Sequence, residues 1–160
     1  MVATQAGVGL GRVVDVIPIA AGQGFSLKNA NAVDFFCTGD GSTSVFTLTV
    51  AATFGGTYYT YSDFTPNFTP FTYYYGQTAT NGTAAWFRTT MTAANAVTPG
   101  TTGTPGKTFT SAMIPLFSTQ LPDGYSYVKM TNSGGAGLVT AVLHDLSVAR
   151  APANLKILGV

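Results

Sequence analysis

Short segments in which apolar and polar residues alternate recur along the chain, and glycine or proline separates them. The clearest is 42–53, STSVFTLTVAAT, in which Phe46, Leu48 and Val50 share one face. Alternation with a period of two is typical of a half-buried β-strand. Segments 83–93 and 138–149 repeat the pattern, so the chain is predicted to consist of strands.

Composition supports this prediction and argues against helices. The chain has 26 Thr and 19 Gly but no Glu. Thr has a restricted χ1 angle that suits a pleated surface, and Gly marks turns and bulges. The prediction is an all-β fold, an antiparallel β-sandwich or barrel of about eight or nine strands, with a jelly roll favoured.

The 160 residues are expected to form one domain with two extended ends. Residues 1–12 are predicted to be a flexible N-terminal arm, 13–150 the β-sandwich, and 151–160 a C-terminal tail. Pro18 should make segment 13–20 an edge strand or mark a strand end, since proline cannot donate a ladder hydrogen bond. Residues 95–108, with three Gly and two Pro, are predicted to be a loop.

Charged residues make up only 8% of the chain. The seven basic residues are scattered singly, and affinity for nucleic acid needs them clustered, so nucleic acid is not an expected partner. The sequence has no run of 18 apolar residues, so no membrane span is expected. The N-terminus lacks the basic start of a signal peptide. A surface with so little charge offers little repulsion between copies, which favours a place in an assembly.

The supply of catalytic groups is thin. His144 is the single histidine and Cys37 the single cysteine, and Cys37 is interpreted as a small buried hydrophobe. Asp145, the neighbour of His144, should point to the opposite face of the strand and so could not orient the imidazole. One His and one Cys cannot form a transition-metal shell. We therefore expect no enzyme activity, no catalytic residue, no metal and no cofactor.

Residues 57–78, TYYTYSDFTPNFTPFTYYYGQT, hold nine of the 20 aromatic residues (one Trp, eight Tyr and eleven Phe). Pro66 and Pro70 prevent one long regular element there. Three interpretations compete: the rings fill the core, they stack on sugars, or they are buried against another protein. Few sugar-bonding side chains accompany the rings, which favours the protein contact for those outside the core.

The run Tyr73–Tyr75 would place rings on both faces of a strand, so at least one of these faces is not the domain's own core. About half of the nine rings are expected to be core residues and the others a subunit contact. The candidate interface residues are Tyr58, Tyr59, Tyr61, Phe64, Phe68, Phe71, Tyr73, Tyr74 and Tyr75.

The ending at 121–160, LPDGYSYVKMTNSGGAGLVTAVLHDLSVARAPANLKILGV, and the Gly/Thr/Ala-rich, charge-poor style of the chain point to a family. In these features the chain resembles the small decoration (auxiliary or cement) proteins on the heads of tailed bacteriophages. The resemblance implies a β-sandwich or barrel that forms an oligomer, often a trimer, on the capsid exterior. Its partners would be other copies and the major capsid protein, and it would be made in the host cytoplasm. The resemblance supplies no site residues.

Two alternatives remain open at the level of sequence. Minor tail and head-fibre proteins share the same style. A carbohydrate-binding β-sandwich module would use the Tyr and Phe cluster together with Trp86.

Overall fold

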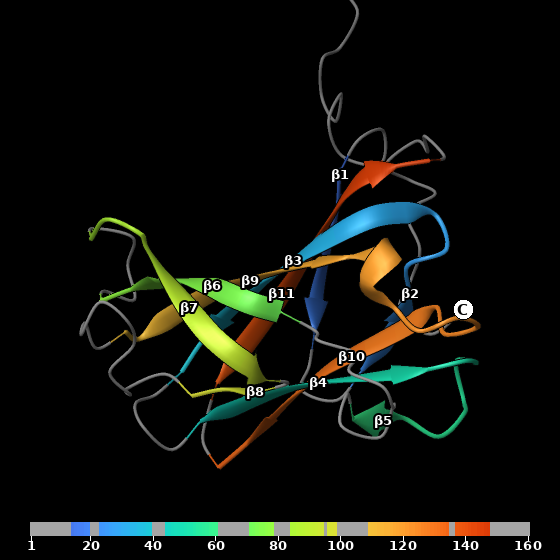
Figure 1. Ribbon diagram of the computed structural model, residues 1–160, viewed down its shortest axis with the longest axis horizontal. Helices are drawn as coiled ribbons and strands as arrows, with labels where there is room; N and C mark the ends of the chain where they lie inside the picture. The colour runs from blue at the N-terminus through green and yellow to red at the C-terminus, as the bar shows by residue number, and fades with distance from the viewer. Residues whose placement is uncertain are drawn as a thin grey trace, which may run out of the picture.

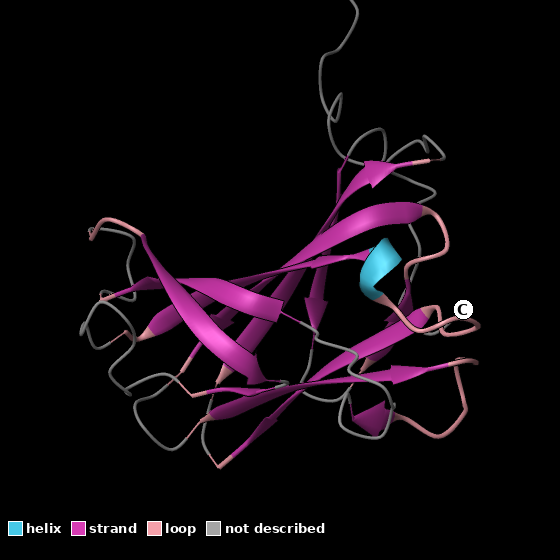
Figure 2. Cartoon of the chain, in the orientation of Figure 1, coloured by secondary structure: helices cyan, strands magenta, loops and turns pink. Residues whose placement is uncertain are grey.

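The structure is a computed structural model that describes residues 14–19, 23–39, 44–60, 71–78, 84–94, 96–98, 109–134 and 137–147. Strands dominate this part of the chain, with one short 3-10 turn (Figures 1 and 2). The elements are β1 (Val14–Ile19), β2 (Gly24–Ser26), β3 (Ala30–Thr38), β4 (Val45–Ala51), β5 (Tyr59–Thr60), β6 (Phe71–Gln77), β7 (Phe87–Ala94), β8 (Ala96–Val97), β9 (Ser111–Phe117), η2 (Ser118–Gln120), β10 (Tyr127–Ser133) and β11 (Leu138–Leu146).

These strands form two antiparallel sheets that pack face to face (Figure 1). The six-stranded sheet has the order β1-β11-β3-β9-β6-β7. The five-stranded sheet has the order β2-β10-β4-β5, and β8 also pairs with β4. Over the described residues neither sheet closes on itself, so the prediction of an all-β sandwich is confirmed and the barrel alternative is not.

The strand order is that of a jelly roll with one added hairpin. β10 pairs with β4 along one edge, so β5 and β8 lie one after the other on its opposite edge. When β5 and β8 are counted as one strand and the hairpin β6–β7 is set aside, eight strands remain. Their orders are first–eighth–third–sixth in one sheet and second–seventh–fourth–fifth in the other, which is the jelly-roll arrangement. The split strand and the hairpin explain why eleven strands occur instead of eight or nine.

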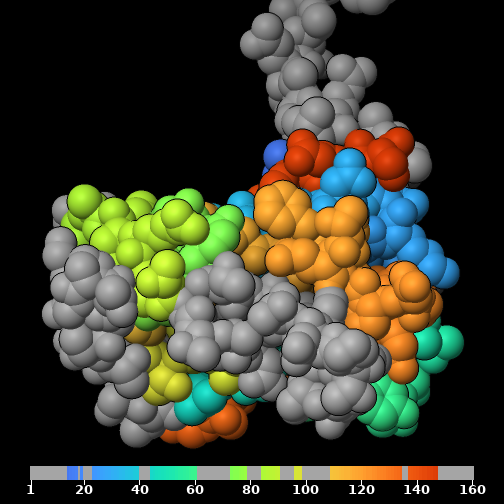
Figure 3. Space-filling view, in the orientation of Figure 1, coloured from blue at the N-terminus to red at the C-terminus, as the bar shows by residue number. Residues whose placement is uncertain are grey.

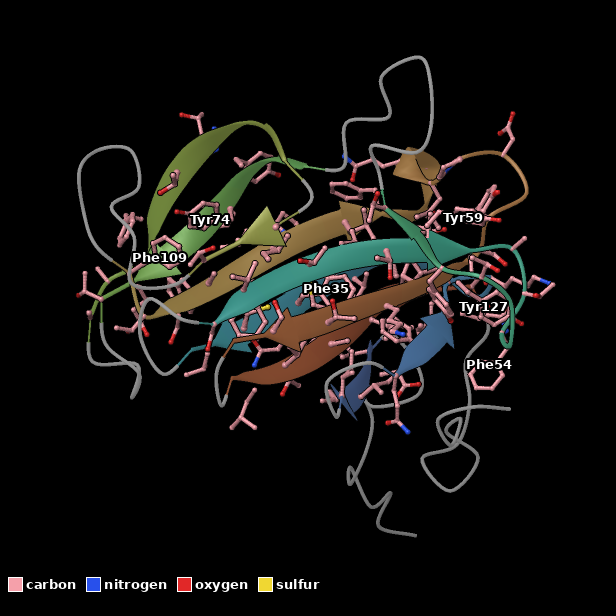
Figure 4. All side chains as sticks on the ribbon, turned by 90° about the horizontal axis from the view of Figure 1, so that it is seen from below. Phe35, Phe54, Tyr59, Tyr74, Phe109 and Tyr127 are labelled. Carbon is pink, nitrogen blue, oxygen red and sulfur yellow. The ribbon has the colours of Figure 1, made fainter. Side chains whose placement is uncertain are left out.

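The core lies between the inner faces of the two sheets. On β4, Phe46, Leu48 and Val50 are all completely buried, as their alternation predicted. Phe35 on β3 faces them from the other sheet and is also completely buried (Figure 4). Removing one such side chain from water contributes about 1.5–3 kcal/mol, so these central strands stabilise the sandwich most.

Three local predictions can be compared with this fold. β1, which contains Pro18, is an edge strand as expected. The predicted loop 95–108 contains the short strand β8, because Val97 is buried in the core and pairs with Phe46. The predicted arms at 1–12 and 151–160 lie outside the described residues.

Candidate functional site

The structure separates the nine rings of the predicted interface. Tyr61, Phe64 and Phe68 lie outside the described residues, and of Phe71 only its position on β6 is described. The other five are divided between the two ends of the sandwich and between inner and outer faces.

Tyr74 is a core residue. Its side chain is 4% exposed and packs on Phe109, with 4.8 Å between ring centroids (Figure 4). Burial raises the pKa of its hydroxyl. Tyr74 therefore does not belong to a contact surface, because the alternation on β6 turns it inward between its two neighbours.

Tyr58 and Tyr59 lie at the other end of the molecule, beside the five-stranded sheet. The Lys129 ammonium lies 5.0 Å from the centroid of the Tyr58 ring, and the Tyr58 hydroxyl donates to the carbonyl of Phe54 at 3.4 Å. Phe54 in turn packs on Tyr127, and Tyr59 meets Tyr125 edge to face, as Figure 4 shows for the labelled rings. These rings are largely engaged with their own chain.

Tyr73 and Tyr75 lie together on the outer face of the six-stranded sheet. Their rings meet edge to face at 5.7 Å, and the Arg88 guanidinium lies 4.3 Å from the centroid of the Tyr73 ring. Both side chains are half-buried. Figure 3 shows β7, the strand of Arg88, at the surface of the molecule in yellow-green. Stacking of this kind fixes the rings while one side stays open to solvent.

Strand register extends this outer face across the whole six-stranded sheet. Tyr75 pairs with Met113, and Val16 on β1 pairs with Val142 on β11, so each pair points to one side. Pro115 and Phe117 lie two and four residues beyond Met113 on β9, hence on the same face. We call the following residues the outer patch: Val16, Tyr73, Tyr75, Met113, Pro115, Phe117 and Val142.

Most of the exposed large hydrophobic side chains lie on the outer side of the six-stranded sheet. The described chain exposes six large hydrophobic side chains, and four of them, Val16, Trp86, Phe117 and Leu138, lie on this side of the six-stranded sheet. Phe117 is 47% exposed and Val16 is 44% exposed. Exposed apolar residues that gather on one face are characteristic of contact sites, whereas scattered single ones are ordinary.

One charged cluster lies within the outer patch, because Asp34 on β3 pairs with Val142 on β11 and with Pro115 on β9. His144 Nε2 is 3.4 Å from Asp34 Oδ2, and His144 Nδ1 is 3.2 Å from Asp145 Oδ2. The expectation that Asp145 points away from His144 was wrong. Asp145 has a φ of 55°, which breaks the regular alternation and turns its carboxylate back to the ring.

The geometry of this cluster limits its chemistry. Both contacts can be hydrogen bonds only when both ring nitrogens carry protons. Each nitrogen of His144 lies next to a carboxylate and not next to a nucleophile. The carboxylates of Asp34 and Asp145 lie on opposite sides of the ring and do not converge. The described ranges contain no group of three His, Cys, Asp or Glu side chains that could hold a metal.

Asp34 and Cys37 both have a raised pKa. Burial raises the pKa of the Asp34 carboxyl, and its contact with His144 offsets part of that increase. Burial also raises the pKa of the Cys37 thiol well above its usual range. Cys37 is 1% exposed, which confirms its interpretation as a small core hydrophobe.

Sequence reasoning missed most of the outer patch. The signal was present in β1 and β9, whose segments VDVIPI and SAMIPLF are each apolar at every position but one. A strand that is apolar on both sides needs cover on both sides. The nine clustered rings drew attention to 57–78, while the larger surface is assembled from strands far apart in the chain.

Comparisons with protein-family models, with curated proteins and with solved structures found no match. In the part of the chain that the structure describes, no helix is long and apolar enough to cross a membrane. The function proposed below therefore depends on the geometry of the outer patch and on the resemblance noted in the sequence.

Proposed function

We propose that this chain is a structural protein of a virion, a head decoration or minor capsid protein that binds the capsid lattice and stabilises it. The observation that carries the proposal is the apolar outer face of the six-stranded sheet. The resemblance to phage decoration proteins supplies the setting. In this proposal the outer patch is buried against the major capsid protein or against another copy of the chain in an oligomer, of which a trimer is favoured.

The size of the face is suitable for such a contact. Six strands at about 4.8 Å spacing and roughly seven residues at about 3.3 Å rise give a plane on the order of 600 Å². A stable protein contact of standard size buries about 800 Å² on each partner. The outer patch, with its flanking residues, is therefore large enough for most of one such contact.

The chemistry of the face also favours a protein partner. Aromatic residues, Met and Arg are the types enriched in protein contacts, and Tyr73, Tyr75, Met113 and Arg88 supply them here. Burying apolar area contributes about 25 cal/mol per Å² before the cost of association. Repetition of a modest contact over a lattice strengthens binding through avidity. A near-neutral chain, of net charge +1, opposes this packing little.

A cosedimentation experiment with undecorated capsids tests the proposal. The variant Val16→Lys puts a charge in the outer patch at an exposed position, so the fold should tolerate it. The matched control is Val45→Lys, which replaces a half-buried valine on the outer face of the five-stranded sheet, where Val45 pairs with Ser133. We expect the wild-type chain and the control to bind, and Val16→Lys to bind at least tenfold more weakly.

Two results would contradict the proposal. One is a wild-type chain that stays monomeric by light scattering and ignores capsids. The other is an equal loss of binding in both variants, since the contact would then not be specific to the outer patch.

A further inference from the structure

A pocket of about 210 Å³ opens at one end of the outer face, next to the outer patch. Its polar side is a row across three neighbouring strands, because Ser111 on β9 pairs with Thr38 on β3 and with Gln77 on β6. Its apolar side is formed by Phe36 and Trp86. Cys37 and Ala112 also line the pocket.

The two aromatic rings form a corner. Phe36 and Trp86 meet at 73° with 6.4 Å between centroids, so the face of one ring stands nearly perpendicular to the other. Trp86 remains 44% exposed. The carboxamide of Gln77 donates to the carbonyl of Ala84, two residues before Trp86, and so ties the Trp86 segment to the row of polar side chains. The indole is thereby held at the pocket while much of its surface stays open.

The opposite side of the pocket offers hydroxyl groups. Thr38 and Ser111 carry hydroxyls and line this side, and Ser111 is 7% exposed. A ligand that leaves such groups dry and unbonded loses about 1–3 kcal/mol for each of them. The pocket therefore suits a ligand with an apolar face for the rings and hydroxyls for the polar row.

We propose that this pocket binds a single neutral pyranose ring, such as the terminal sugar of a glycan. The C–H face of the sugar stacks on Trp86, and its hydroxyls bond with Thr38, Ser111 and Gln77. The described residues that line the pocket carry no charge, which disfavours phosphorylated and acidic sugars. The volume is below the range of about 300–1,000 Å³ typical for drug-sized ligands, so one ring fits better than a chain of rings.

A purely apolar ligand, such as the side chain of a partner's Phe, fits less well. It would cover the Thr38 and Ser111 hydroxyls without bonding to them. The sugar proposal is independent of capsid binding, because the pocket occupies one end of the face and the outer patch extends from there across the sheet.

Intrinsic fluorescence gives a direct test, since Trp86 is the chain's single tryptophan. The full chain is titrated with the methyl glycosides of glucose, galactose, mannose and N-acetylglucosamine. Stacking should remove water from the indole and shift its emission to shorter wavelength, saturating at millimolar concentration, as is usual for one small contact. The double variant Thr38→Val, Ser111→Ala keeps Trp86 as reporter and should bind about tenfold more weakly. The control Thr47→Val, on the other sheet, should bind like the wild type.

Three outcomes would overturn the proposal. The first is no saturable response to any of the glycosides by a chain whose circular dichroism shows it to be folded. The second is equal affinity in the wild type and the double variant. The third is tighter binding of N-acetylphenylalanine amide than of every glycoside, which would make the pocket a site for a protein side chain. Cosedimentation of the double variant with capsids is expected to be unchanged, so failure of this proposal and failure of the capsid proposal can be distinguished.

Discussion

The outer faces of the two sheets differ although their inner faces are alike. Both inner faces are apolar, as any sandwich requires. The outer face of the five-stranded sheet is mainly hydroxyl-bearing, and its residues include Ser26, Thr47, Thr49, Thr60, Thr131 and Ser133. The outer face of the six-stranded sheet instead carries the outer patch.

This difference shows which features belong to folding and which point to a contact. The hydroxyl-rich face is compatible with water. The rings that do lie near the five-stranded sheet, Tyr58 and Tyr127 among them, interact with each other or with Phe54 and Lys129. In the outer patch, Tyr73 and Tyr75 also contact each other, but Val16 and Phe117 are 44% and 47% exposed on the same face, and we infer that another chain covers this face.

The largest expected effect is on stability, which should fall much more when a buried ring is removed than when an exposed ring of the outer patch is removed. Phe35→Ala removes a completely buried ring and should lower the free energy of unfolding by about 3–5 kcal/mol. Phe117→Ala removes a 47% exposed ring of the outer patch and should cost less than about 1 kcal/mol. Urea denaturation monitored by circular dichroism measures both. A similar loss for Phe117→Ala would mean that the outer patch serves the fold.

An effect of intermediate size is expected when a glycine is replaced by alanine, and it should be larger on an inner face, at Gly76, than on an outer face, at Gly24. A Cβ on Gly76, on the inner side of the six-stranded sheet, would lie 2.8 Å from Phe87 and 3.1 Å from Phe109. Overpacking of a core typically costs about 1–3 kcal/mol, so Gly76→Ala should lower the melting temperature clearly.

On the five-stranded sheet, a Cβ on Gly24 would lie 1.9 Å from the Tyr58 hydroxyl. That ring lies on the outside and can move aside, so Gly24→Ala should lower the melting temperature less than Gly76→Ala. The matched variant Gly24→Ala, Tyr58→Phe should recover part of the loss because the hydroxyl is gone. If Gly24→Ala proves the more damaging glycine variant, the Tyr58 ring is held more firmly than this account allows.

The smallest predicted effect is the pH dependence of stability that Asp34, within the outer patch, produces. The raised pKa of Asp34 means that the folded protein holds this proton more tightly than the unfolded chain does. The carboxyl therefore lowers stability as pH rises from below its ordinary value of 3.8 to above its raised folded value. As the pH rises from below 3.8 through the raised folded pKa, the unfolding free energy of the wild type should fall relative to that of Asp34→Asn.

The exposed turn residue Asp123 supplies the control, and Asp123→Asn should follow the wild type over the same interval. A wild type that gains stability relative to Asp34→Asn across this interval would show that the attraction of His144 outweighs burial.

The fold could be predicted to a large extent from the sequence. Alternation identified β4 and β11, and Pro18 identified β1 as an edge. The outer patch could not be predicted in the same way, because alternation divides a strand into two faces without saying which strands share a sheet. The turn of Asp145 toward His144 was also beyond prediction, since it depends on one residue with a positive φ within a strand pattern.

The central claim is that the outer patch is covered in the native assembly, and oxidative footprinting tests it most directly. Hydroxyl radicals should oxidise the half-buried side chains of Met113 and Tyr127 in the isolated chain, while the completely buried Met130 should react in neither state. In capsid-bound protein, Met113 should become protected and Tyr127 should react as before. Continued oxidation of Met113 together with protection of Tyr127 would contradict the account and assign the contact to the five-stranded sheet.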